Sequence, residues 1–192
     1  MRSFIAAAAC MLLAACNPAP QPPSITPIDF SGKAPISLNV AEIRVVENYQ
    51  SPLNAPNVEH LFPTSPAKAV KTWTSQRLRA AGTAGILEVV VDDASVIEKE
   101  LPKTEGVRGL FTDDQAERYD ARLRVTMRLY AGDRAISDAE GNVNVVRARS
   151  INEKATLSER EQFYQQIVID MMQQFDSEAE MRLRQYFSNY LR

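Results

Sequence analysis

The sequence has very few residues that support cysteine or histidine chemistry. Among its 192 residues there are two cysteines, Cys10 and Cys16, and one histidine, His60. Residues 17–192 therefore contain no thiol for a disulfide, a redox pair or a thiolate metal site. Zinc sites without cysteine usually need more than one histidine. We expect His60, which lies in a proline-rich stretch, to be exposed or structural, and we predict no metal site.

Motifs for other reactions are missing as well. The chain has no glycine-rich phosphate loop, no G-x-S-x-G elbow around a nucleophilic serine and no internal repeat. Adjacent carboxylates occur at 92–93 and 113–114, but neighbours on a strand point to opposite faces, and a loop pair offers too few ligands for a calcium motif. The net charge of −2 does not fit a general nucleic-acid binder. We therefore predict a protein that is not an enzyme, has no cofactor and binds no nucleic acid.

The first 16 residues have the pattern of a bacterial lipoprotein signal. Arg2 gives a positive start, and 4–15 is a run of apolar and small residues that is too short to span a bilayer. Residues 13–16 read Leu-Ala-Ala-Cys, which fits a lipobox. We predict that 1–15 is a signal peptide and that Cys16 becomes the N-terminus, carrying diacylglycerol and an amide-linked chain such as palmitate. The alternative is an ordinary secretory signal in which Cys16 is incidental.

Residues 16–35 are predicted to form a tether to a single domain, 36–192. Six prolines between residues 17 and 35 favour extended polyproline II structure, part of which, at 25–30, can lie on the domain surface. The residue after the lipobox cysteine is Asn17. An aspartate at that position favours retention in the inner membrane. Because residue 17 is asparagine, we expect export to the outer membrane, with the domain at its inner leaflet and facing the periplasm.

Four stretches alternate between apolar and polar residues with the period of two that is typical of half-buried strands. They are 36–45, 86–100, 119–130 and 142–154. The first two each change phase once, which predicts bulges at Ala41-Glu42 and near Asp92-Asp93. In the fourth, we expect a phase change near residues 145–146 that would place its two arginines on the solvent-exposed face.

Two helices are predicted. The first begins with Ser65 as N-cap and Pro66 at the first helical position, and it ends at Gly82. The second begins with a capping box at 158–161 and continues to about residue 191. Its apolar stripe weakens at 176–180, which indicates either one long overhanging helix or a kink. The element order predicts an α+β two-layer sandwich, a mostly antiparallel four-stranded sheet with two helices on one face.

Together, the lipobox, the proline-rich tether and the order β-α-β-β-β-α resemble the small outer-membrane lipoproteins of the LptE type and the ABC-type transport auxiliary lipoproteins. The alternating run 119–129 and residues 73–78 of the first helix carry the local likeness. The resemblance implies a non-catalytic accessory in assembly or transport of outer-membrane lipid or lipopolysaccharide, with a barrel or transporter component as partner. The alternative is a structural or scaffolding lipoprotein of the cell envelope without a lipid ligand.

Five arginines make the first candidate binding surface, a basic patch on the open sheet face. They are Arg122, Arg124, Arg128, Arg147 and Arg149. Guanidinium groups pair bidentately with phosphate, so a phospholipid or lipopolysaccharide headgroup is a suitable ligand. The alternative interpretation is a solvated face on which the arginines pair across strands with Glu88, Asp92 and Asp120.

A loop tip and the end of the last helix are further candidates. The loop contains Val107, Leu110 and Phe111, which either insert into a partner or membrane or fold back over the core. Residues 181–192 mix arginines with three aromatic residues. They either dock on a partner or lipid surface, or pack their aromatic rings into the core.

Overall fold

The computed structural model of the protein describes residues 25–102, 115–132 and 136–192. Within these ranges the strands are β1 (Ile36–Leu38), β2 (Glu42–Glu47), β3 (Leu78–Ala80), β4 (Ile86–Asp93), β5 (Val96–Glu100), β6 (Gln115–Tyr130) and β7 (Ala139–Asn152). The helices are α1 (Pro66–Arg77), α2 (Leu157–Tyr186) and the short 3-10 helices η1 (Glu59–Leu61) and η2 (Ser188–Tyr190).

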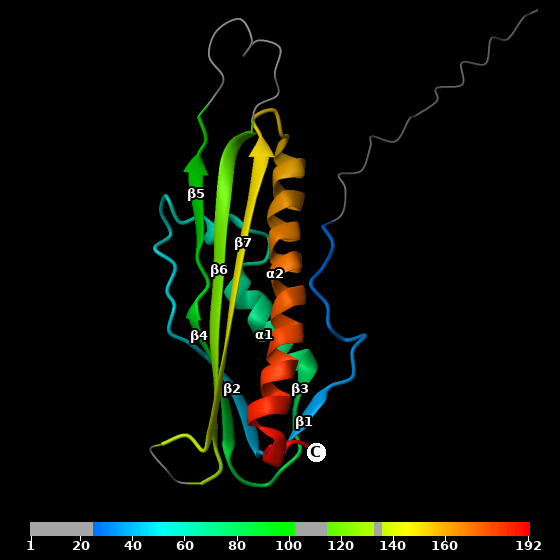
Figure 1. The fold of residues 1–192 in the computed structure, drawn as a ribbon. Coiled ribbons are helices and arrows are strands. Elements are labelled where there is room, and N and C mark those ends of the chain that lie inside the picture. Colours follow the sequence, from blue (N-terminus) through cyan, green and yellow to red (C-terminus); the bar gives the residue numbers. More distant parts are fainter. Residues whose placement is uncertain (1–24, 103–114, 133–135) are drawn as a thin grey trace, which may run out of the picture.

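Strand β6 is the centre of the main sheet (Figure 1). One of its edges pairs with β7, and the other pairs with β4 over 124–130 and with β5 over 117–121, all antiparallel. β2 lies outside β4 and pairs with it in parallel. The predicted α+β class is confirmed, but the sheet has five strands rather than four, and one of its pairings is parallel.

The predicted strand 86–100 is divided between β4 and β5. The irregularity expected near Asp92-Asp93 is present, because the register against β6 shifts between Val91 and Asp93. Asp93 then turns the chain, since its Oδ1 accepts a hydrogen bond from the Ser95 N–H at 3.0 Å. Both strands meet the same edge of β6, which explains how one alternating stretch contains two strands.

The predicted strand 36–45 is also two strands, which lie in different sheets. β1 pairs in parallel with β3, while β2 joins the main sheet. The prediction of a bulge at Ala41-Glu42 was wrong, because the chain breaks there into two strands of different sheets. Gly82 packs against the chain between these two strands. A Cβ on Gly82 would lie 2.6 Å from the carbonyl carbon of Asn39, so the approach requires glycine. Gly82 follows β3, and α1 ends at Arg77 rather than at Gly82 as predicted.

Both helices cover the same face of the main sheet, as predicted. Alternate residues of the strands form one continuous core with them. Trp73 of α1 and Phe175 of α2 meet edge to face, with ring centroids 4.9 Å apart. Fully buried side chains of the sheet are Leu87, Val89, Val91, Val96, Tyr119, Ala121, Leu123, Val125, Met127, Leu129 and Val145. In Figure 1 α2 runs beside β7 in the opposite direction.

The start of α1 is confirmed, whereas the start of α2 differs from the prediction. Ser65 caps α1 by accepting a hydrogen bond from the backbone of Lys68 at 3.3 Å. The capping box of α2 is formed by Thr156 and Glu159, not by residues 158–161. From there α2 continues for 30 residues, about 45 Å, as one uninterrupted helix. No helix in the described ranges combines the length and apolarity needed to cross a bilayer.

Residues 25–35, which we call the strap, pack along both helices before β1 begins. The Thr26 carbonyl accepts a hydrogen bond from Gln165 Nε2 of α2 at 2.8 Å. The Phe30 N–H donates to Gln76 Oε1 of α1 at 2.7 Å, and the Phe30 side chain belongs to the core. The second half of the proline-rich stretch is therefore part of the folded domain.

Candidate functional site

The five arginines that were predicted to share the open sheet face lie on two different faces. The three in β6 alternate with fully buried residues and point away from the helices: Arg122, Arg124 and Arg128. The two in β7 point to the helix side: Arg147 and Arg149. Arg149 donates a hydrogen bond to Asp170 of α2 at 3.0 Å, and its guanidinium carbon lies 5.7 Å from the ring centroid of Phe163.

The wrong placement of Arg147 and Arg149 comes from the expected phase change in β7. The register between β6 and β7 is continuous from Glu117 to Leu129, so no phase change occurs near residues 145–146. Arg147 therefore lies on the same side of the sheet as the buried Val145. The five arginines do not form one patch, because the sheet itself separates them.

On the open face, one of the three β6 arginines is paired with a carboxylate. Arg128 Nε donates to Glu140 Oε2 at 2.9 Å. No carboxylate in the described ranges pairs with Arg122 or Arg124. Two of the acids expected as their partners bind other groups: Asp120 accepts from Lys99 and Arg118, and Asp92 accepts from Thr126. The predicted cross-strand neutralisation is therefore wrong for Arg122 and Arg124.

Two sets of predicted residues lie outside the described ranges. One is the lipidation residue Cys16 with the signal peptide 1–15. The other is the loop tip with Val107, Leu110 and Phe111. The interpretations of both sets stay predictions.

The aromatic residues of the C-terminal segment divide between core and surface. Phe187 is fully buried, and Tyr190 packs against the core, as the packing interpretation predicted. Tyr186 remains 47% exposed and Met181 remains 51% exposed. The C-terminal segment therefore contributes mainly to the core, and its exposed Tyr186 and Met181 leave a small apolar surface.

His60 is exposed on η1. It lines a cavity of about 390 Å³ together with Glu59 and Tyr49. In the described parts of the chain, no three side chains of the histidine, cysteine, aspartate or glutamate type come together as a metal site.

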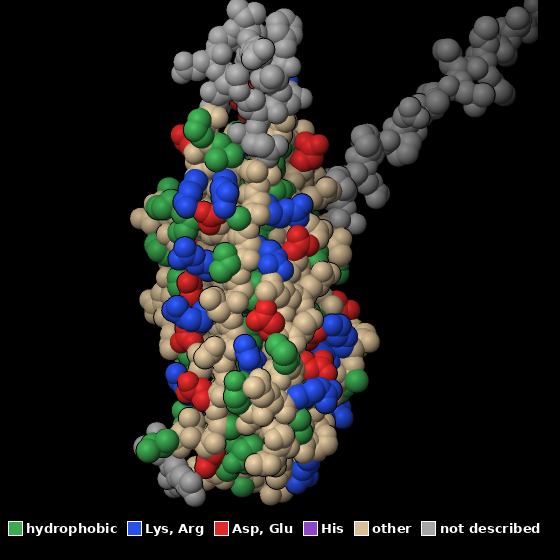
Figure 2. Space-filling model, viewed as in Figure 1, with side chains coloured by type: hydrophobic (Ala, Val, Ile, Leu, Met, Phe, Trp, Pro, Cys, Tyr) green, Lys and Arg blue, Asp and Glu red, His purple; other side chains and the backbone are tan. Residues whose placement is uncertain are grey.

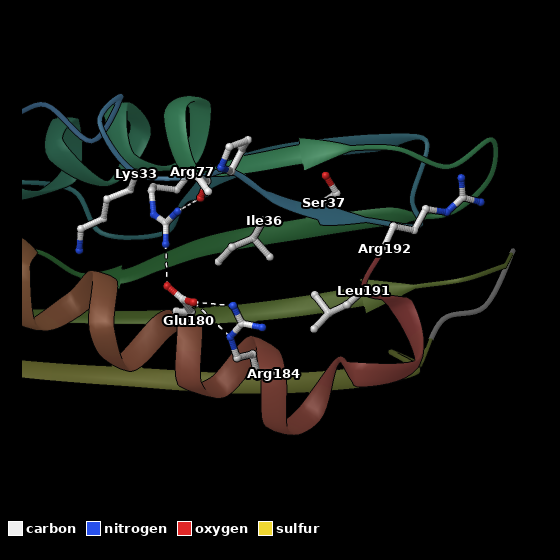
Figure 3. Close-up of a pocket in the computed structure, with 10 residues that line it drawn as sticks. Lys33, Ile36, Ser37, Arg77, Glu180, Arg184, Leu191 and Arg192 are labelled. Carbon is white, nitrogen blue, oxygen red and sulfur yellow. Dashed lines mark hydrogen bonds and ion pairs between the residues drawn. The ribbon is translucent and has the colours of Figure 1, made fainter.

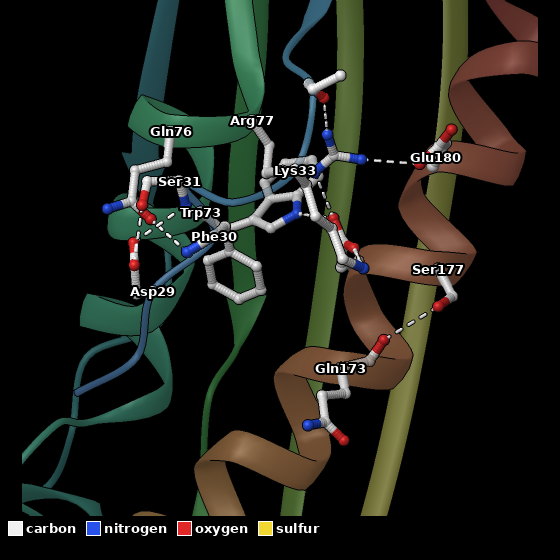
Figure 4. A network of polar contacts seen from close by, with 12 residues as sticks. Asp29, Phe30, Ser31, Lys33, Trp73, Gln76, Arg77, Gln173, Ser177 and Glu180 are labelled. Carbon is white, nitrogen blue, oxygen red and sulfur yellow. Dashed lines mark hydrogen bonds and ion pairs between the residues drawn. The ribbon is translucent and has the colours of Figure 1, made fainter. Parts of the chain in front are cut away.

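A buried polar cluster, which we call the Asp176 cluster, joins the strap and both helices (Figure 4). The Asp176 side chain is 1% exposed. Its Oδ1 accepts hydrogen bonds from Trp73 Nε1 at 2.7 Å and from Arg77 Nε at 2.8 Å, and its Oδ2 accepts from Lys33 Nζ at 2.5 Å. Arg77 also donates to Glu180 Oε2 at 2.7 Å. Three segments that are distant in sequence thus meet on one carboxylate.

The polar atoms of the Asp176 cluster satisfy one another. Burial alone would raise the pKa of Asp176, but hydrogen bonds from Lys33, Arg77 and Trp73 outweigh it and hold the pKa below its ordinary value. The remaining nitrogen of the Arg77 guanidinium donates to the carbonyl of Ala34 in the strap. Because donors and acceptors are matched, this arrangement fastens the strap and α1 to α2 rather than offering a proton-transfer group to a substrate.

A cavity of about 460 Å³ lies beside the cluster, between the strap, β1 and the C-terminal segment (Figure 3). Its charged lining residues are Lys33, Arg77, Arg184, Arg192 and Glu180. Arg184 Nη2 donates to Glu180 Oε1 at 2.7 Å, and Arg192 Nη1 donates to the Ala81 carbonyl at 2.5 Å. In Figure 3, Arg77 and Arg184 both point toward Glu180. The cations are already bonded to the domain's own acceptors, so an anion would have to displace them.

A second buried carboxylate, Glu59, holds the loop between β2 and α1. It is 2% exposed, and its Oε1 accepts hydrogen bonds from the hydroxyls of Tyr49 at 2.6 Å and Ser51 at 2.5 Å. Its Oε2 accepts from the Val96 N–H at the start of β5, at 3.0 Å. Burial would raise the pKa of Glu59, but these hydrogen bonds outweigh it and lower the pKa. Glu59 therefore ties this loop to the sheet.

Sequence reasoning missed both buried carboxylates. The sequence signal for Asp176 is the weakening of the apolar stripe at 176–180, which by itself predicts a kink or an overhanging helix. The weakening instead marks the point where α2 faces the polar donors of α1 and the strap. Glu59 gave no comparable signal, because it lies in a loop without periodicity.

No known protein family matches this sequence, and no curated protein matches it. Among solved structures, the chain is similar to a protein of Xanthomonas campestris from family DUF330, with a TM-score of 0.37 and 11% identity, covering 85% of this chain and 95% of that one. It is also similar to rare lipoprotein B of Shewanella oneidensis, with a TM-score of 0.34 and 11% identity, covering 74% of this chain and 98% of that one. Neither likeness assigns a ligand or a partner to this chain.

Proposed function

We propose that this protein is a lipid-anchored, non-catalytic lipoprotein of the cell envelope. It acts through a protein partner as an accessory in assembly or transport of outer-membrane lipid or lipopolysaccharide. The observation that carries the proposal is the Leu-Ala-Ala-Cys sequence at 13–16, placed after a short apolar run. The clustered titratable groups Asp176 and Glu59 are bonded to structural partners, which favours a binding role over a reaction.

The length of the tether between Cys16 and the strap limits how far the domain extends from an anchored cysteine. Residues 16 to 25 are nine residues apart, and an extended chain covers at most about 3.6 Å per residue, so Ile25 lies within about 32 Å of the cysteine. Thr26 is bonded to Gln165, about 12 Å from the start of α2 and about 32 Å from its end. The tether therefore joins the domain closer to the end at which α2 begins than to the end at which α2 finishes.

A protein partner fits the surface better than a headgroup bound by five arginines. The sheet separates Arg147 and Arg149 from the β6 arginines, so the original patch is reduced to three cations, of which Arg128 is paired with Glu140. The basic cavity near Arg184 is engaged by internal hydrogen bonds. These observations support a partner recognised through an extended surface.

Anchoring is tested by metabolic labelling with palmitate in the full-length protein. The wild-type chain is expected to take up the label, and Cys16→Ser is expected to lose it completely. Cys10→Ser is the matched control, because Cys10 lies in the segment to be removed and should leave labelling unchanged. Labelling that survives Cys16→Ser would exclude the lipobox assignment.

The partner is tested by purifying the complex with the lipidated wild-type protein as bait and unlipidated Cys16→Ser as control. Recovery of a β-barrel or a transporter component with the lipidated bait is the expected result. Recovery of peptidoglycan alone, or of nothing specific to the lipidated bait, would favour the structural or scaffolding alternative.

A further inference from the structure

Strand β7 is a long edge strand of the main sheet, and α2 packs along its helix-facing side. It contains 14 residues and pairs with β6 in one continuous register that runs from Glu117 to Leu129 of β6. No strand in the described ranges pairs with its other side. A strand at the edge of a sheet presents a row of unpaired backbone N–H and C=O groups to any extended chain that approaches it.

The hydrogen bonds of β6 determine which backbone groups of β7 face this edge. The Arg122 N–H donates to the Ser95 carbonyl, and the Ala116 carbonyl accepts from Leu101, so even-numbered residues of β6 bond toward β4 and β5. In an antiparallel sheet, the backbone N–H and C=O groups of successive residues point to opposite neighbouring strands. The backbone groups of odd-numbered residues of β6 therefore bond to β7, where their register partners are also odd-numbered. The N–H and C=O groups of the even-numbered residues of β7 therefore point to the free edge.

The even-numbered residues of β7 also carry short, uncharged side chains over most of the edge. They are Asn142, Asn144, Val146, Ala148 and Ser150, all exposed on the open face. β7 contains no proline, no lysine and no bulge over this stretch, so three of the devices that block strand addition are missing; α2 packs along the helix side of β7 and leaves the open face uncovered. Figure 2 shows Lys and Arg side chains next to Asp and Glu side chains on the face that carries the main sheet.

In the described ranges, the backbone groups on this edge have one partner. Arg147 Nη1 donates to the Val146 carbonyl at 3.0 Å, and no other backbone bond outside the sheet ladder involves residues 140–150. This contact confirms independently that the Val146 carbonyl lies on the free side. A single arginine is a weak cover, because a mobile side chain can be displaced by a backbone N–H.

The charges next to this edge that lack an oppositely charged partner in the described ranges are cationic, whereas Asp120, which lies opposite Ala148, is bonded to Lys99 and Arg118. Arg122 and Arg124 of β6 are the register partners of Val146 and Asn144 of β7, and Arg147 belongs to β7 itself. No carboxylate in the described parts of the chain pairs with these three arginines. Because the β7 side chains between them and the edge are short, a guanidinium can extend over β7 toward an added strand about 4.8 Å beyond it.

We propose that the free edge of β7 between Asn142 and Ser150 is a strand-addition site for an extended, acidic segment of a partner protein. The segment would form backbone hydrogen bonds with Asn144, Val146 and Ala148, and its carboxylates would pair with Arg122 and Arg124. The inference goes beyond the proposed lipoprotein function and does not depend on lipidation, since it rests on the ladder and the charges of the folded domain.

Amide hydrogen exchange of the full-length protein tests the site with a synthetic peptide about ten residues long, of alternating glutamate and threonine. In the free protein, the amides of Asn144, Val146 and Ala148 are expected to exchange faster than those of Val143 and Val145. Adding the peptide is expected to slow exchange at the three even positions. A peptide N-methylated on alternate residues is expected to leave them unchanged, because it cannot continue the ladder.

Two variants separate backbone pairing from charge. Val146→Pro removes one N–H from the free edge without touching the β6 ladder, and we expect it to weaken peptide binding about 5-fold, the effect of one hydrogen bond. Arg122→Glu with Arg124→Glu is expected to weaken binding more than about 10-fold and to reverse the preference toward a lysine-threonine peptide. Lys68→Glu with Arg79→Glu is the matched control, since both lie on elements that do not pair with β7, and it should bind like wild type.

Several results would overturn the proposal. One is unchanged exchange at Asn144, Val146 and Ala148 with saturating peptide, or equal protection by the N-methylated peptide. Protection without peptide that increases with protein concentration would assign the edge to a second copy of this chain. Protection by phosphatidylglycerol vesicles but not by peptide would assign the arginines to a lipid headgroup. If the melting temperature of Val146→Pro is lower than that of wild type, binding of the two peptides by the variant with Arg122→Glu and Arg124→Glu still tests the proposal.

Discussion

The Asp176 cluster and the outer edge of β7 differ in whether their polar groups have hydrogen-bond partners within the domain. Around Asp176, two cations, an indole N–H and two carboxylates are bonded to one another, and the central carboxylate is almost fully buried. Along β7, backbone groups of alternate residues point away from the sheet, and Arg122, Arg124 and Arg147 have no carboxylate partner in the described ranges. One region uses its charges to hold segments together, and the other leaves them available.

The comparison shows that the density of charge does not locate a binding surface. The cavity beside the Asp176 cluster is lined by more cations than the β7 edge, yet those cations already bond to Asp176, Glu180 and backbone carbonyls. The edge of β7 has fewer charges, and among the described residues its outward backbone groups have one partner, Arg147 on the Val146 carbonyl. What distinguishes the two regions is whether the fold itself satisfies the polar groups.

The largest effect is expected for Asp176→Asn. This change leaves the buried Arg77 with less compensating charge, so we expect the free energy of unfolding to fall by roughly 3–5 kcal/mol, as for a broken buried ion pair. Urea denaturation measures it. Asp170→Asn is the control, because Asp170 forms an exposed pair with Arg149 that should contribute less than about 1 kcal/mol. Equal effects of the two changes would remove the contrast between the regions.

Acid unfolding of wild type and Asp176→Asn tests the charge of the same carboxylate. The pKa of Asp176 in the folded protein lies below its ordinary value of 3.8. Its contribution to stability is therefore complete above that value and is lost as the pH falls through the folded pKa. Wild type should lose unfolding free energy more steeply than the variant below about pH 4. Parallel curves would mean that Asp176 is not held in the charged form.

A smaller loss is expected for Glu59→Gln. The neutral amide cannot accept the hydrogen bonds of Tyr49, Ser51 and Val96 as strongly, and its NH₂ group faces a donor, so the free energy of unfolding should fall by about 1–3 kcal/mol. Glu47→Gln is the control, since Glu47 pairs with Lys71 on the surface. Amide exchange along β7 should not change in either variant, because neither residue touches that edge.

The fold class followed from the sequence because its signals are local. The period of two in 119–130, the cap at Ser65 and the helical stripe after residue 160 each depend on neighbours within a few positions, and the structure has all three. The number of strands did not follow. Whether a phase change is a bulge or a break depends on contacts far along the chain, such as Gly82 against Asn39.

The placement of the candidate site could be predicted only in part for the same reason. Arg122, Arg124 and Arg128 alternate with buried residues in an unbroken pattern, so their face was predicted correctly. In β7, apolar residues at both 145 and 146 made the pattern ambiguous, and Val146 proved to be the exposed one, at 52%. That β7 is an edge strand is a property of the whole sheet, which no stretch of β7 itself encodes.

The smallest effect on stability is expected for Arg122→Ala combined with Arg124→Ala. Both side chains are exposed and have no carboxylate partner in the described ranges, so their removal should change the free energy of unfolding by less than about 0.5 kcal/mol. Urea denaturation of this variant beside Arg128→Ala, which loses the pair with Glu140, measures the difference. A loss above about 1 kcal/mol would show that the two arginines support the fold, and their availability to a partner would then no longer distinguish the β7 edge from the Asp176 cluster.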